Sequence, residues 1–92
     1  NLESANLAAS RLSGARFNEA TLRNTVFLGS DLSNACFKGM HLINCDLSGT
    51  NLAGADFRDA DLSGANGLFA EQIQRARVNT NTRLPRNLKL SS

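Results

Sequence analysis

Residues 51–65 read NLAGADFRDADLSGA, three successive five-residue units in which Leu52, Phe57 and Leu62 hold the same position. The spacing extends back along the chain without an insertion, because every fifth residue from Leu2 to Leu62 is Leu or Phe. Neither an α-helix, with a period of 3.6 residues, nor a flat strand, with a period of two, brings residues five apart to one buried face. A short regular period instead predicts a solenoid, in which each unit contacts its neighbours.

The residues around each central Leu or Phe predict where the chain turns. Two positions before the centre the side chain is nearly always small, as at Ala35 and Ala55, which suits a second inward position. Two positions after it stand mostly Gly or Asn, as at Asn34, Gly49 and Gly64. Both residues tolerate the positive φ that the third residue of a type II turn requires. Each unit is therefore predicted to be a short extended face followed by a corner.

A second period, of twenty residues, lies beneath the period of five. Phe17, Phe37 and Phe57 are twenty residues apart, and small residues repeat at the same interval beside them. Four faces with one corner each give a coil of twenty residues, so the three rings are expected on one face of successive coils. Stacking of aromatic rings between coils would select this spacing, and the sequence therefore predicts a core ladder of Phe17, Phe37 and Phe57.

The units at residues 5–7 (ANL), 55–57 (ADF) and 60–62 (ADL) resemble the A(D/N)LXX motif of the pentapeptide-repeat family. The resemblance extends over residues 1–66. It implies an all-β solenoid, a right-handed quadrilateral β-helix of about three coils, whose extended faces are joined by backbone hydrogen bonds from coil to coil. Residues 1–66 are accordingly expected to form the repeat domain.

The five-residue register breaks after residue 66. Within residues 67–78, Phe69, Ile73 and Ala76 follow the i, i+4, i+7 spacing of a helix. This spacing predicts a short C-terminal capping α-helix that covers the last coil, because an open coil exposes its core and unpaired backbone groups. Residues 79–92 are expected to form an extended polar tail. The stretch GLFAEQI…RLP, from Gly67 to Pro85, resembles the tails that follow pentapeptide repeats in bacterial proteins.

The N-terminal coil has no comparable cap in the sequence. We therefore expect either a preceding segment of a parent chain or a second copy, in a dimer, to cover it.

Charge is distributed unevenly along the 92-residue chain, whose net charge is +2. Residues 1–66 hold five basic and seven acidic side chains, whereas residues 67–92 hold five basic and one acidic. Nucleic-acid binding through the basic tail is one alternative, but no aromatic side chain is interleaved with its five bases, and a solvated tail is the favoured interpretation. The chain has neither an apolar run of membrane-spanning length nor a signal-peptide pattern, and we expect a cytoplasmic protein without membrane contact.

Three apolar residues stand where the repeat points outward. Val26 and Leu28 flank Phe27, and Ile43 occupies an outward position on the adjacent face, one coil above Arg23. Scattered surface apolar residues are common and need no explanation. The alternative is a partner-binding patch made of Val26, Leu28 and Ile43, for an unknown protein partner.

The sequence offers no catalytic, cofactor-binding or metal-binding constellation. Cys36 is expected to point outward and Cys45 inward, too far apart for a disulfide, which fits a reducing compartment. His41 is the only histidine and has no ligand partner in register, so no metal site is expected. The aspartates occupy repeat and corner positions, which explains their presence without chemistry.

These features favour a non-enzymatic structural or protein-interaction module without a cofactor. The family resemblance suggests an alternative, because some members that protect DNA gyrase resemble DNA in shape and charge. A DNA mimic needs a long, strongly acidic surface. The predicted stack is short and its net charge is only −2, so this alternative is disfavoured.

Overall fold

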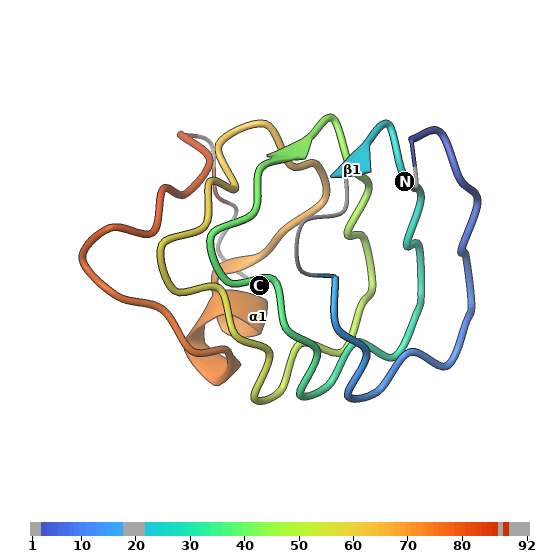
Figure 1. Cartoon of the computed structure of the whole chain (residues 1–92), viewed down its shortest axis with the longest axis horizontal. Helices are drawn as coiled ribbons and strands as arrows, with labels where there is room; N and C mark the ends of the chain where they lie inside the picture. The colour runs from blue at the N-terminus through green and yellow to red at the C-terminus, as the bar shows by residue number, and fades with distance from the viewer. Residues whose placement is uncertain (1–2, 18–21, 87, 89–92) are drawn as a thin grey trace.

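The computed structural model describes residues 3–17, 22–86 and 88. Successive coils of the chain lie side by side along the long axis of the molecule (Figure 1). The N-terminal residues form one end of this stack, and the short helix α1, Ala70–Arg75, lies toward the other end together with the residues that follow it.

Parallel pairing joins residues that are twenty positions apart in the repeat region. The only regular strands among the described residues are short: β1, Leu22–Arg23, pairs with β2, Leu42–Ile43. Single-residue bridges complete the pattern, and His41 with Asp61 extends the column of β1 and β2. The other three columns are Asn6, Val26, Asp46 and Asn66; Arg11, Asp31 and Asn51; and Arg16, Cys36 and Asp56.

Where an Asp or Asn precedes the centre of a unit, its side chain stabilises the backbone of that unit. Asp46 Oδ1 accepts a hydrogen bond from the N–H of Ser48 at 2.9 Å, and Asp61 Oδ1 accepts one from Ser63 at 2.9 Å. Asn51 Oδ1 makes the equivalent bond with an amide as the acceptor. Short Asp and Asn side chains favour this local bond to the backbone two residues ahead. The D/N preference of the repeat therefore has a structural cause.

Among the described residues, the Gly and Asn corners take the backbone conformation that the sequence predicts, with one exception. Asn34 has φ 59° and Gly49 has φ 65°, both in the left-handed region. Gly64 does not have positive φ, so the expected corner geometry is wrong at this position. Its carbonyl accepts the N–H of Asn44, whereas in the coil below the N–H of Asn24 bonds to the residue before the corner. The pairing has shifted by one residue here, and this shift turns the peptide.

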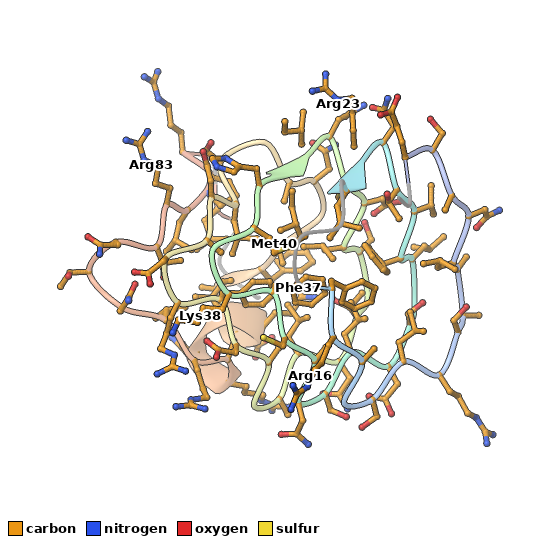
Figure 2. All side chains as sticks on the ribbon, in the orientation of Figure 1. Arg16, Arg23, Phe37, Lys38, Met40 and Arg83 are labelled. Carbon is orange, nitrogen blue, oxygen red and sulfur yellow. The ribbon has the colours of Figure 1, made fainter. Side chains whose placement is uncertain are left out.

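The interior is a column of apolar side chains that runs through all the coils. The rings of Phe17 and Phe37 stack with centroids 4.7 Å apart, and those of Phe37 and Phe57 stack at 4.9 Å. Phe27 meets Phe37 edge to face at 6.1 Å. Figure 2 shows Phe37 and Met40 within the stack. Among the described residues, no buried side-chain nitrogen or oxygen lacks a hydrogen-bond partner.

Helix α1 packs on the core through one apolar side chain and one amide. Ile73 is buried and belongs to the hydrophobic cluster of the coils. Gln72 Oε1 accepts the N–H of Phe69 at 2.8 Å, which satisfies a free donor at the helix start. Gln72 Nε2 donates to the carbonyls of Leu47 and Thr50, both at 3.1 Å. These bonds tie α1 to the coil beneath it.

Beyond α1 the chain continues as a further rung, by which we mean a segment that pairs in parallel with the coil before it. Arg77 bridges Asp56 and Arg83 bridges Asp61, at separations of 21 and 22 residues rather than twenty. The helix and the loop after Arg77 therefore each add one residue to the coil without breaking the pairing. Within the described part of the chain, no helix is long and apolar enough to cross a membrane.

Candidate partner-binding surfaces

Val26 and Leu28 lie on one face of the stack, either side of the buried Phe27. Leu28 is 48% exposed, and Val26 is half-buried between Asn6 and Asp46, its bridge partners in the adjacent coils. Val26 and Leu28 thus form a small apolar site, with the polar residues Asn6 and Asp46 in the coils on either side of Val26.

Ile43 is the last residue of β2, directly before the corner at Asn44, and is 44% exposed. This corner carries a ladder of amide side chains, in which Asn44 Nδ2 donates to Asn24 at 2.6 Å and Asn66 Nδ2 donates to Asn44 at 3.0 Å. The structure therefore brings Val26 and Leu28 together on one face and places Ile43 on the adjoining face, across a polar edge.

A second surface, which we call the basic face, consists of Arg16, Lys38, Arg58 and Arg77. These four side chains line one open hollow of about 470 Å³ on the face that also holds Cys36. Figure 2 shows Arg16 at one edge of the stack, with Arg23 and Arg83 projecting from the opposite edge. The face thus gathers basic residues from four successive rungs.

Asp56 controls the charge of the basic face. Its two carboxylate oxygens accept hydrogen bonds from Nε and Nη2 of Arg58, each at 2.9 Å. The bidentate bond to Arg58 is the main reason that the pKa of Asp56 falls from 3.8 to about 2, and the charge of Arg77 acts in the same direction. Asp56 is therefore ionised at neutral pH and holds Arg58 in a fixed orientation.

Two other aspartates, Asp31 and Asp61, accept hydrogen bonds from serines two residues ahead in the same repeat unit. Hydrogen bonds from Ser33 and Ser63 lower the pKa of Asp31 and Asp61, respectively, whereas a general acid at neutral pH needs a raised value. His41 Nδ1 lies 3.6 Å from Asp61 Oδ2 at an exposed position. In the described ranges, no group of three or more His, Cys, Asp or Glu side chains is placed to hold a metal ion.

The two thiols lie in different environments. Cys36 is half-buried on the basic face, while Cys45 is buried and its Sγ donates to the carbonyl of Leu22 at 2.6 Å. Burial raises the pKa of the Cys45 thiol. No disulfide joins them.

The sequence analysis did not predict the basic face, although the spacing of three of its four basic residues is visible in the sequence. Arg16 shares a twenty-residue column with Asp56, and Lys38 and Arg58 share another. Arg77 falls outside the regular spacing, because α1 adds a residue before it. Only the structure reveals that it joins the others.

Comparison with known proteins agrees with this architecture. The family model of pentapeptide repeats matches residues 1–39 and 37–66, in eight copies. A crystal structure of a pentapeptide repeat protein (Rfr23) from the cyanobacterium Cyanothece 51142 superposes with a TM-score of 0.75 at 29% identity. The match covers 88% of this chain and 54% of that one. No curated protein matches the chain.

A second solved structure is a pentapeptide repeat protein from the thylakoid lumen of Arabidopsis thaliana. It superposes with a TM-score of 0.68 at 26% identity, over 92% of this chain and 58% of that one. The chain thus spans little more than half the length of either neighbour. Because the family model covers most of the sequence and both neighbours share the repeat, the chain belongs to the pentapeptide-repeat family.

Proposed function

We propose that this chain is a non-enzymatic structural or protein-interaction module that binds a protein partner through an apolar patch of Val26, Leu28 and Ile43. The observation that carries the proposal is the exposure of Leu28 and Ile43, 48% and 44%, on a backbone paired with coils on both sides. Apolar side chains held on a rigid frame lose little conformational entropy when a partner covers them.

In this proposal the repeat region forms a right-handed quadrilateral β-helix of about three coils. The four columns of parallel bridges support four faces, and the strong preference of parallel connections for right-handed crossovers supports the hand. Helix α1 acts as the cap of this β-helix. Support for the cap comes from the buried Ile73 and from the bonds of Gln72 to carbonyls of the last full coil.

Quantitative affinity capture from a lysate of the source cells tests the apolar patch. Three baits are compared: wild type, a patch variant with Val26→Asp and Leu28→Asp, and a matched control with Val78→Asp and Leu84→Asp. In the wild-type protein, Val78 and Leu84 are 42% and 38% exposed elsewhere on the surface. We expect a protein that wild type and the control retain and the patch variant loses.

Equal retention by all three baits would contradict the proposal and make Val26 and Leu28 ordinary surface residues. Unfolding of the patch variant is detected by its circular dichroism spectrum, in which case Val26→Ser and Leu28→Ser replace the aspartates.

A further inference from the structure

The basic face carries cations that are not committed to partners within the described residues. Arg16, Lys38 and Arg77 are exposed, and none forms an ion pair within 4.0 Å of a carboxylate in the described ranges. Arg58 is the exception, because Asp56 binds it at 2.9 Å. Three cations therefore remain available to a ligand.

The spacing of these cations follows from the coils. Arg16 and Arg77 stand at the two ends of one column, with Cys36 and Asp56 on the rungs between them. Three steps of ~4.8 Å separate the end rungs by ~14 Å. Lys38 lies beside the middle of this column, one rung from Arg58, since the N–H of Gly39 bonds to the carbonyl of Arg58.

An extended peptide presents side chains at a matching interval. Alternate residues of a strand point to the same side and are ~6.7 Å apart, so the first and fifth residues are ~13 Å apart. Three alternating carboxylates therefore fit the two ends and the centre of the column. The end carboxylates reach Arg16 and Arg77, and the central one reaches Lys38.

Acidic side chains border the basic face and limit the size of its ligand. Asp31 belongs to the column of the neighbouring face, and Asp59 occupies the corner after Arg58. Duplex DNA carries about one charge per 1.7 Å of its axis and would extend onto these carboxylates. Among its described lining residues the hollow has no aromatic side chain on which the bases of a single strand could stack.

We propose that the basic face binds a short acidic segment of a partner protein, in extended conformation, with carboxylates at alternate positions. This surface is separate from the apolar patch, and its residues differ from those of the proposed function. A partner of this kind is recognised by ion pairs at the two ends and the centre of the column, while Asp56 keeps Arg58 in place beneath it.

Titration of the ¹⁵N-labelled protein with the peptide Ser-Glu-Ser-Glu-Ser-Glu-Ser, followed by NMR, tests this proposal. We expect the resonances of Arg16, Lys38 and Arg77 to shift, and binding to weaken as salt is raised. The peptide Ser-Ser-Glu-Glu-Glu-Ser-Ser has the same composition but turns its central carboxylate to the other side, and it should bind at least about threefold more weakly.

A triple variant with Arg16→Gln, Lys38→Gln and Arg77→Gln should bind the alternating peptide at least about tenfold more weakly. The matched control, Arg23→Gln with Arg83→Gln and Arg86→Gln, changes the net charge by the same amount and should bind like wild type. All six side chains are exposed, so both variants are expected to fold, and thermal unfolding checks this.

Equal weakening in both triple variants would overturn the proposal, because it would mean binding to net charge alone. Tighter binding of a twenty-nucleotide DNA than of the peptide, at the same residues, would also overturn it in favour of nucleic acid. Equal binding of the two peptides would refute the alternating spacing.

Discussion

Replacing Phe37 by Ala removes the middle ring of the core ladder. Phe37 is fully buried, stacks on Phe17 and Phe57 at 4.7 and 4.9 Å, and meets Phe27 edge to face. Removal of a core Phe costs about 3–5 kcal/mol, because its apolar surface no longer packs and a cavity remains. Each aromatic interaction adds ~0.5–1.5 kcal/mol beyond its buried area.

Because the substitution removes the ring that faces Phe17, Phe27 and Phe57, we expect the free energy of unfolding to fall by about 4–5 kcal/mol. A chain of 92 residues has a total free energy of unfolding of ~5–14 kcal/mol. The variant should therefore lose a large part of its stability, or unfold if the wild type lies at the lower end of this range. Phe17→Ala should cost less, because Phe17 stands at the end of the described ladder and stacks on one ring, Phe37, rather than on two.

Urea unfolding followed by circular dichroism measures these differences. Phe69→Ala is the matched control, because Phe69 is 40% exposed, and its truncation should cost less than about 1 kcal/mol. A Phe37→Ala variant within ~1 kcal/mol of wild type would refute the stabilising role of the ladder, as would a Phe69→Ala variant that costs as much as Phe37→Ala.

Three other substitutions or treatments test particular features. Gly49→Ala should lower the free energy of unfolding by about 1–2 kcal/mol, because φ is +65° there and an alanine is strained in this left-handed conformation. Gly64 does not have positive φ, so Gly64→Ala should cost clearly less in the same urea assay. Asp56 has a folded pKa of about 2, below its ordinary 3.8, so its carboxylate stabilises the fold above ~pH 4 and loses this effect as pH falls toward 2. The stability gap between wild type and Asp56→Asn should therefore close between ~pH 5 and pH 2, and a constant gap would contradict this. Maleimide should label Cys36 in the native protein and Cys45 only after unfolding, and early labelling of Cys45 would show that its burial is wrong.

The Asp56 prediction and the basic face are linked. Protonation of Asp56 would release Arg58, so the face gains positive charge at low pH. The measurements of peptide binding therefore belong near neutral pH, where Asp56 is ionised.

Much of the repeat region can be predicted from the sequence because its forces are local. An aspartate such as Asp46 bonds to the backbone two residues ahead, and a Gly or Asn such as Gly49 or Asn34 permits the left-handed corner. Both effects act within a single five-residue unit, and units in the middle of the stack have similar units in the coils on either side. Four such units make one coil of twenty residues, which places Phe37 between Phe17 and Phe57 in the neighbouring coils.

The C-terminal end depends on interactions between distant residues. Gln72 bonds to carbonyls of Leu47 and Thr50, and Asn79 Nδ2 donates to Asp59 at 2.9 Å. These bonds join segments at least twenty residues apart, and no local pattern encodes them. The geometry of Gly64 is decided in the same way, by a backbone bond from Asn44 in the coil beneath.

Spacing within and between similar units is enough to predict the repeat, most of its corners, the core ladder and the exposed position of Leu28. The same spacing does not predict that Arg77 joins Arg16 and Lys38 on one face, which becomes visible only in the folded chain. The residue that α1 adds moves Arg77 off the twenty-residue period, and its pairing with Asp56 restores it to the column. Backbone hydrogen bonding between coils, rather than sequence period, thus assembles the basic face.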